Sequence, residues 1–580
     1  MLTSTQESIN RLQETAGDFV ADLRELMDTD AVTAQVDPVG VSGALRRAVA
    51  SLAGQPLGVT QTATSFAARS AQAALTTLLR AVGLDVTGPA DLATRDRRYA
   101  DPAYTSNAWF YLARQQHKLF SDCVRELAER ARLDPPSRAK LDFAVGQLIA
   151  GTAPTNFPLT NPAPLKQAID TGGLSLLRGM RNLVRDVITN RGWPRQVTPG
   201  QFQVGREMAI TPGKVVFRNR LIELIQYEAQ SESVHEVPML FSPPWINKYY
   251  IMDLAPGKSL VEWAVQHGHT CFMISYRNPD ESLSDVTMSD YLREGPLAAL
   301  DVVEEITGAP EVNLVGLCLG GTLGAATTAW LAARGEKRIS SLTLLNTLLD
   351  FQAPGQLGVF TDEETVARLE QRISRSGYLP AENMKTTFDL LRATDLVWNY
   401  VINDWMLGKD PAPFDMLTWN SDSTRMPASM HLEYLRSCYL ENQLAKGEMS
   451  LADERLDLGQ IHQDGYVVTA EDDHIAPWPA VFSGARLLGG TVRFVLSNSG
   501  HIAGVVNPPS PKSKHWYSES DTLPEESDAW RSQATEQTKS WWEDWTEWIA
   551  QHAGERRDPR PLGNATHPPR EDAPGSYVRG

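Results

Sequence analysis

One cysteine lies in a glycine-rich stretch that could support nucleophilic catalysis. The stretch G-L-C-L-G-G covers Gly316 to Gly321 and has Cys318 at its centre. In the nucleophile elbow G-x-S-x-G, small residues allow a sharp strand-to-helix turn that exposes the nucleophile. The stretch therefore predicts acyl transfer by Cys318. The alternatives are a buried structural cysteine and a nucleotide loop, but neither G-x-G-x-x-G nor G-K-[ST] occurs at this stretch.

Two later segments could supply an acid and a base for this cysteine. The segment A-E-D-D-H-I-A-P-W begins at Ala470, and S-N-S-G-H-I ends just after His501. Nucleophile, acid and histidine in this chain order are typical of an α/β-hydrolase triad. A lone surface histidine is the alternative for His501, but its position behind a glycine and after a strand favours catalysis.

Spacing alone does not decide which carboxylate would serve. Glu471, Asp472 and Asp473 are adjacent, so two of them are expected to be structural or solvated. His474 could imitate a catalytic base. Neighbouring side chains of an extended segment point in opposite directions, however, so His474 and the acid are not expected to face one site.

The oxyanion hole requires two backbone donors near Cys318. The N–H of Leu319 follows the nucleophile directly. A second donor could come from the loop S-P-P-W-I, which begins at Ser242. Proline has no N–H, so Trp245 or Ile246 must donate, and we favour Ile246.

The elements around these residues alternate between short apolar runs and helical stretches from residue 237 onward. This alternation predicts an α/β-hydrolase-like, mostly parallel sheet built from βαβ units. The predicted strands are 237–241, 270–276, 312–317, 341–345, 465–470 and 492–496, and the predicted helices include 258–267, 290–306 and 322–333.

Three regions are expected along the chain. Residues 1–94 form a variable, loosely helical N-terminal arm that could be mobile, with helical character at 67–82. Residues 95–234 form a mostly helical N-terminal domain. Residues 235–580 form the catalytic domain, in which a helical block at about 350–457 interrupts the strands and is interpreted as a cap over their carboxyl ends.

A tryptophan-rich tail follows residue 508. Trp541, Trp545 and Trp548 have helical i, i+4, i+7 spacing and would share one apolar face. The simpler interpretation is a helix that packs on the body of the protein. The alternative is a surface that binds a polymer or a partner.

Composition and charge exclude several classes of protein. The chain has 580 residues, of which 42% are hydrophobic and 22% charged, and its net charge of −17 argues against nucleic-acid binding. The four cysteines have no metal-like or disulfide-like spacing. The first residues lack the features of a signal peptide, and no apolar run could span a bilayer. A cytoplasmic protein without transmembrane segment, metal or redox cofactor is expected.

Several segments resemble the polyhydroxyalkanoate synthases. They include the three catalytic segments G-L-C-L-G-G, E-D-D-H-I-A-P-W and S-G-H-I-A-G-V-V-N-P-P, together with R-Y-A-D-P-A-Y, S-P-P-W-I-N-K-Y-Y-I-M-D-L, W-N-Y-V-I-N-D-W and the closing A-P-G-S-Y-V. The resemblance runs from about Arg98 to the last residues. It implies that Cys318 is the nucleophile, Asp473 the acid and His501 the base.

The resemblance also implies a function and partners. The substrates would be (R)-3-hydroxyacyl thioesters of coenzyme A and a growing polyester chain, with release of coenzyme A. It further implies a homodimer of the single-subunit type on cytoplasmic polyester granules, possible contacts with granule-associated proteins, and a weak preference for short-chain monomers (class I).

Two departures and two alternatives accompany this resemblance. Ala476 replaces a bulkier residue, and Trp245 occupies a variable position, which puts the acyl-chain preference in doubt. A cysteine hydrolase, such as a thioesterase or lactone hydrolase, would share the triad. A non-catalytic granule scaffold would retain the fold, but the complete set of Cys318, Asp473 and His501 argues against it.

Overall fold

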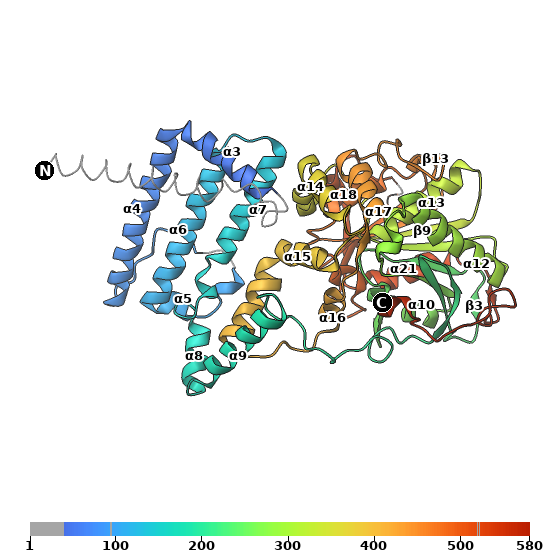
Figure 1. Cartoon of the computed structure of the whole chain (residues 1–580), viewed down its shortest axis with the longest axis horizontal. Helices are drawn as coiled ribbons and strands as arrows, with labels where there is room; N and C mark the ends of the chain where they lie inside the picture. Colours follow the sequence, from blue (N-terminus) through green and yellow to red (C-terminus); the bar gives the residue numbers. More distant parts are fainter. Residues whose placement is uncertain (1–39, 93–95, 519, 521) are drawn as a thin grey trace. The chain divides into compact units, whose positions relative to one another are not determined.

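The computed structural model describes residues 40–92, 96–518, 520 and 522–580. They fall into two compact units (Figure 1). The first contains the described residues up to 182 together with 362–369 and 405–408, and the second contains the other described residues. Residues 1–39 of the predicted arm and the predicted boundary at 94/95 lie outside the described residues. The boundary at 234/235 stays a prediction, since the units divide at 182/183.

The first unit is built from helices. Asn107 caps α6 by accepting from the N–H groups of Trp109 and Phe110, and Asp134 caps α7 ahead of a proline. Helix α4 packs against α6, and α3 packs against α7. The helices of this part include α3 (Val41–Ala53), α4 (Pro56–Ala81), α5 (Ala103–Ser106), α6 (Ala108–Arg130), α7 (Pro135–Gly151) and α8 (Pro162–Asp170).

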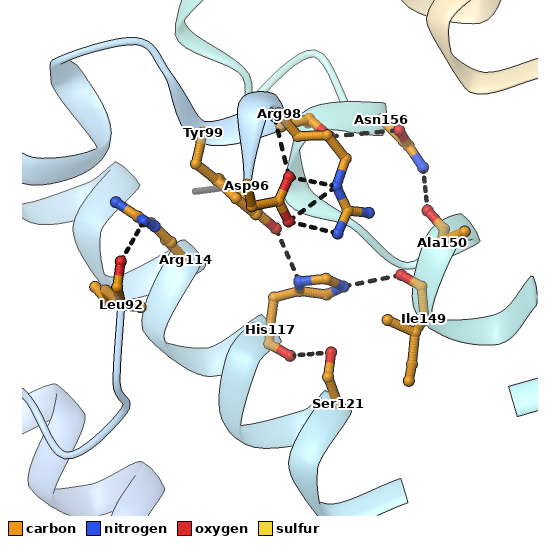
Figure 2. Close-up of polar contacts among 11 residues, drawn as sticks. Leu92, Asp96, Arg98, Tyr99, Arg114, His117, Ser121, Ile149, Ala150 and Asn156 are labelled. Atoms are coloured by element: carbon orange, nitrogen blue, oxygen red, sulfur yellow. Dashed lines mark hydrogen bonds and ion pairs between the residues drawn. The ribbon is translucent and has the colours of Figure 1, made fainter. Parts of the chain in front are cut away.

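Figure 2 shows a buried polar network that fixes the R-Y-A-D-P-A-Y segment on these helices. The Tyr99 hydroxyl lies 2.8 Å from Nδ1 of His117, whose Nε2 lies 2.9 Å from the carbonyl oxygen of Ile149. Burial lowers the pKa of His117, so this ring stays neutral near pH 7. Asp96 accepts from the guanidinium of Arg98 at 2.7 Å. The network joins α6 to the end of α7.

The second unit contains a ten-stranded sheet whose central strands are parallel, as the sequence predicts. The order is β1-β2-β7-β4-β8-β9-β14-β15-β16-β17, and the pairs from β7 to β15 are parallel. The parallel strands are β4 (Met239–Ser242), β7 (Cys271–Tyr276), β8 (Val312–Leu317), β9 (Ile339–Leu345), β14 (Asp464–Ala470) and β15 (Val492–Ser497). These six strands match the six predicted runs.

Residues 95–234 are mostly helical, as predicted, but they end in two strands that the sequence did not predict. Strands β1 (Gly213–Arg218) and β2 (Ile222–Tyr227) pair antiparallel and extend the sheet beyond β7. Strand β2 is buried throughout, including Glu223 and Gln226. Glu223 accepts from Ser576 and Tyr577, and Gln226 donates to the Pro561 carbonyl at 3.0 Å. Because residues far along the chain form hydrogen bonds with these polar side chains, both faces of β2 can be buried. The sequence of β2 therefore lacks the alternation of polar and apolar residues that predicts a half-exposed strand.

Helices connect and cover the strands (Figure 1). The stretch predicted as one helix at 290–306 is divided at Gly295 and Pro296, because proline cannot continue the backbone hydrogen bonds. The connecting helices include α10 (Leu260–Gln266), α11 (Met288–Leu292), α12 (Ala298–Thr307), α13 (Leu319–Ala333) and α18 (Trp478–Ala485). Among the described helices, none combines the length and apolar character that a membrane crossing requires.

The segment predicted as a cap is helical, with only two-residue strands among its described residues. Its π-helical turns cover Thr394–Trp398, Val401–Met406 and Leu435–Leu440. Its helices are α14 (Glu363–Ile373), α15 (Ala381–Leu391), α16 (Asp415–Ser421) and α17 (Ala428–Tyr434). Its strands are β10 (Tyr378–Leu379), β11 (Met426–Pro427), β12 (Ser450–Leu451) and β13 (Glu454–Arg455).

The tail packs on the sheet. Strands β16 (His515–Tyr517) and β17 (Thr535–Gln537) continue it antiparallel beyond β15. In helix α21 (Trp541–Ala550), Trp541, Trp542 and Trp545 are buried. The indole N–H of Trp545 donates to Oγ1 of Thr343 in β9 at 3.0 Å. The predicted apolar face therefore belongs to the core of the second unit.

Candidate active site

Cys318 occupies a strained turn between β8 and α13. Its φ of 51° and ψ of −120° lie in a region that L-residues rarely adopt. The Cys318 N–H donates to the Leu345 carbonyl at 2.8 Å. The Cys318 side chain is half-buried rather than enclosed. This is the geometry of a nucleophile elbow.

The glycines of the elbow are required by close contacts. A Cβ at Gly316 would overlap the backbone of Gly321, and a Cβ at Gly321 would overlap the side chain of Thr347. A Cβ at Gly320 would overlap the carbonyl oxygens of Ser242 and Pro243. The helix after the nucleophile therefore packs directly against the loop that follows β4.

Asp473 is held by the backbone after β14. Its side chain is fully buried, and Oδ1 accepts from the N–H groups of Ile475 at 2.8 Å and Ala476 at 2.9 Å. Oδ2 lies 2.7 Å from Nδ1 of His501. A carboxylate held in this way fixes the ring of the histidine and keeps its Nε2 free to face another group.

The two neighbouring carboxylates do not reach His501. Glu471 and Asp472 are exposed, and Glu471 pairs with Arg531 at 3.3 Å. His474 also stays outside the pair. Burial lowers the pKa of His474 to about 4, so the ring is neutral at pH 7. The structure thus brings Asp473, and not its neighbours, to His501.

His501 lies on a loop after β15, and residues that directly follow β14 and β9 form hydrogen bonds with this loop. The Asp472 N–H donates to the Ser499 carbonyl at 2.9 Å, and Ser499 has a φ of 87°. The side chain of Asn346, which directly follows β9, donates to the carbonyl of His501. Asn346 is fully buried with a φ of 45°. We did not expect this residue from the sequence, although a buried polar residue at the carboxyl end of a parallel strand is a usable signal.

The electrostatics of the site favour a charged imidazole. Burial opposes protonation of His501, but the charge of Asp473 and hydrogen bonds to Asp473 and Cys318 outweigh it and raise the pKa of His501 to about 10. His501 therefore carries a proton at pH 7 beside the Cys318 sulfur. A cationic partner of this kind stabilises a nucleophilic thiolate.

The predicted oxyanion donors lie on the two segments that meet at the elbow. Leu319 is the first residue of α13, directly after Cys318. Ser242 pairs with Gly316 at the end of β4, and the chain then runs through two prolines to Trp245 and Ile246. The contact of Gly320 with Ser242 and Pro243 brings this loop against the elbow. Assignment of Leu319 and Ile246 as donors stays a prediction.

Comparison with known proteins identifies the family. Residues 95–264 match the family described as the poly-beta-hydroxybutyrate polymerase N-terminus, and residues 228–508 match the alpha/beta hydrolase fold. The chain is 44% identical over 506 residues to the poly(3-hydroxyalkanoate) polymerase subunit PhaC of Rhizobium meliloti, covering 87% of this chain and 82% of the relative. The chain belongs to the poly(3-hydroxyalkanoate) polymerase family.

Other polymerases of this family are similar over comparable lengths. The polymerase subunit PhaC of Cupriavidus necator is 41% identical over 503 residues, which are 85% of this chain and 84% of the relative. The poly(3-hydroxyalkanoate) polymerase of Methylorubrum extorquens is 44% identical over 487 residues, which are 83% and 80% of the two chains. The similarity therefore covers most of both proteins in each pair.

The sequence did not reveal an aromatic cluster that lies beside Cys318. Burial, and to a lesser extent the nearby Cys318 sulfur, raises the pKa of Tyr434 and Tyr439, whose rings meet edge-on at 5.5 Å. Phe351 packs on both tyrosines, and Trp245 packs on Tyr434 at 5.9 Å. The predicted cap segment thus reaches the surroundings of Cys318 through aromatic side chains.

The two departures from the family pattern contact the site. Trp245 is buried against Tyr434 in the aromatic cluster, and Ala476 is buried while its N–H donates to Asp473. A change of side-chain volume at either position would alter the surroundings of Cys318, Asp473 or both. No group of three or more potential metal ligands is arranged to hold an ion in the part of the chain that the structure describes.

Proposed function

We propose that the protein polymerises (R)-3-hydroxyacyl thioesters of coenzyme A into a polyhydroxyalkanoate polyester through an acyl-Cys318 intermediate. The observation that carries the proposal is the strained Cys318 elbow beside a His501 that pairs with a buried Asp473. Membership of the polymerase family supports the substrate class.

The first step is acyl transfer to the enzyme. The Cys318 sulfur attacks the thioester carbonyl, and the tetrahedral oxyanion accepts from the N–H groups of Leu319 and Ile246. When the intermediate collapses, the bond to the coenzyme A sulfur breaks, and the proton on His501 passes to that sulfur. One thioester replaces another, so the acyl group keeps its activation.

The second step lengthens the polymer. A 3-hydroxyl oxygen, on the growing chain or the incoming monomer, attacks the acyl-Cys318 carbonyl while His501 takes its proton. The carbon–sulfur bond breaks, an oxoester forms and the Cys318 thiolate is regenerated beside the protonated His501. The oxoester is less activated than the thioester, which drives elongation. Asp473 orients the ring and stabilises its charge in both steps.

The chemistry of the nucleophile supports transfer over hydrolysis. A serine would form a less activated acyl-enzyme, whereas the cysteine thioester remains reactive toward a hydroxyl group. Tyr434 and Tyr439 lie beside Cys318, and with Phe351 packed on both they provide largely apolar surroundings for an acyl chain. Such surroundings also disfavour water as a competing nucleophile.

Incubation with 3-hydroxybutyryl-coenzyme A tests this function. We expect release of coenzyme A together with turbidity from insoluble polymer, and we expect Cys318→Ala to abolish both. Release of coenzyme A with only soluble 3-hydroxy acid would contradict the polymerase and support a thioesterase. Because short-chain preference is also a proposal, 3-hydroxyoctanoyl-coenzyme A should be tested alongside and should give slower release.

We extend the proposal to the assembly of the protein. The family resemblance supports a homodimer that works without a second type of subunit at the surface of cytoplasmic polyester granules. Sedimentation of the purified chain, before and after polymer forms, measures both properties. A monomer throughout, or protein that stays in the supernatant when polymer pellets, would contradict them.

A further inference from the structure

A buried lysine follows the loop that bears the proposed oxyanion donors. Lys248 lies two residues after Ile246, and only 4% of it is exposed. Its ammonium donates to the carbonyl oxygens of Val578 at 2.9 Å and Gly580 at 2.6 Å. Burying a charge costs free energy unless hydrogen bonds compensate it. These carbonyls therefore couple the loop to residues more than three hundred positions away.

The other side of the loop is also fixed. The Lys248 carbonyl accepts from the indole N–H of Trp419 at 2.8 Å, and the Trp245 carbonyl accepts from the Thr424 hydroxyl at 3.2 Å. The backbones of Asn247 and Ser423 form an isolated bridge. Trp245, Asn247 and Lys248 of this loop are thus bonded to the 419–424 segment, and the lysine side chain reaches the C-terminal segment.

The C-terminal segment is itself anchored on the sheet. Buried Glu223 of β2 accepts from the N–H groups of Ser576 and Tyr577, both at 3.0 Å. The Tyr577 hydroxyl donates to the Asn219 carbonyl at 2.6 Å. Asn278, just after β7, donates to the Gly580 carbonyl at 3.1 Å. Glu223 in β2 and Asn278 after β7 therefore position the segment that supplies the acceptors for Lys248.

We propose that Lys248 is a positioning residue for the oxyanion hole, which ties the donor loop to the sheet-anchored segment 576–580. The proposal rests on the proposed function, because it assigns a task to the loop of Trp245 and Ile246 in acyl transfer. It also gives the closing A-P-G-S-Y-V region a role in the site, although that region lies far from Cys318 in sequence.

The test separates acyl transfer from the general reactivity of Cys318. Acylation by 3-hydroxybutyryl-coenzyme A passes through an oxyanion, whereas alkylation by iodoacetamide forms a carbon–sulfur bond, expels iodide and forms no oxyanion. In Lys248→Met, which keeps the apolar stem without the donors, we expect the single-turnover acylation rate to fall by on the order of 10²-fold. The alkylation rate should stay within about twofold of wild type.

Lys258→Met is the matched control. Lys258 also forms an ion pair, with Asp415 at 2.7 Å, but it is half-exposed and lies outside the donor loop. Both rates should be unchanged in this variant. If acylation and alkylation fall equally in Lys248→Met, the lysine only maintains the fold and the proposal is wrong. An acylation rate within about twofold of wild type would also overturn it.

A milder variant keeps the proposal testable if Lys248→Met does not fold. Lys248→Gln retains one donor group at the buried position. We expect the acylation rate to fall selectively in this variant too, but by a smaller factor than in Lys248→Met. Equal loss of both rates in this variant would overturn the proposal. If wild-type protein reacts with iodoacetamide but is never acylated, the proposed function fails, and that outcome is distinct from a failure of the Lys248 assignment.

Discussion

Asp473 favours the protonated form of His501 through a hydrogen bond of 2.7 Å. Both of its oxygens are occupied, one by two backbone N–H groups and one by His501. The pairing keeps His501 protonated in a buried place where a lone imidazole would be neutral. Asp473 thus fixes the orientation of the His501 ring and, together with Cys318, its charge.

Replacement of this carboxylate should therefore affect catalysis far more than structure. We expect Asp473→Asn to reduce polymerisation by about 10³–10⁴-fold, the size typical of triads that lose their acid. The amide can still accept one backbone hydrogen bond, so the variant should fold. Single-turnover release of coenzyme A measures the loss. A variant that retains more than about a tenth of wild-type activity would contradict the role of Asp473.

The same pairing predicts a dependence of stability on pH. The folded-state pKa of His501 is raised to about 10, above the ordinary value of 6.5. Its contribution to the free energy of unfolding is therefore fully present below about pH 6.5 and is lost as the pH rises through about 10. Denaturant unfolding between pH 6 and pH 10 should show this loss in wild type. The loss should be smaller in Asp473→Asn, and an equal loss in both would contradict the assignment.

At the scale of elements, the site depends on how closely helix α13 approaches the loop after β4. Gly320 has no space for a side chain, because a Cβ would overlap the carbonyl oxygens of Ser242 and Pro243. Farther along the same helix, a Cβ at Gly324 would meet only the Leu314 side chain at 3.4 Å. Both glycines lie in α13, but only at Gly320 does the packing exclude a side chain.

We expect Gly320→Ala to lower the free energy of unfolding by about 1–3 kcal/mol through overpacking. It should also reduce acylation, because the donor loop must move. Gly324→Ala is the matched change and should be neutral or stabilising by up to about 1 kcal/mol, since alanine favours helix. Denaturant unfolding and single-turnover acylation measure both effects. Equal behaviour of the two variants would show that the close approach does not matter.

At the scale of the whole molecule, residues distant in sequence complete the second unit. The tail adds β16, β17 and α21 to the sheet that carries the triad, and its last residues reach β2. Trp541, Trp542 and Trp545 are part of the same core cluster as strands β8, β14 and β15. The tail is therefore a structural component of the catalytic unit.

This arrangement predicts unequal effects of two tail substitutions. Trp545→Ala should lower the free energy of unfolding by about 3–5 kcal/mol, because the side chain is fully buried. Trp548, on the same helix, is only partly buried, so Trp548→Ala should cost clearly less. Thermal and denaturant unfolding of both variants measure the difference. Equal and small effects would favour the alternative that the tryptophans form a binding surface.

The sequence by itself determined the parts of the protein whose signals are local. The six central strands are short, mostly apolar and mostly buried runs, and the elbow is a glycine-rich turn, so each can be recognised within a few residues. The chain order of nucleophile, acid and histidine also follows from the sequence alone. The identity of the acid did not follow from spacing, because three carboxylates are adjacent.

Only the tertiary structure revealed the buried polar residues whose hydrogen-bond partners lie far along the chain. Strand β2 contains Glu223 and Gln226 yet is buried throughout, because Ser576, Tyr577 and Pro561 form hydrogen bonds with these two side chains. Asn346 and Lys248 likewise gain their importance only from carbonyl groups brought to them by folding. A buried polar residue looks like a surface residue in the sequence, since its hydrogen-bond partner leaves no periodic trace.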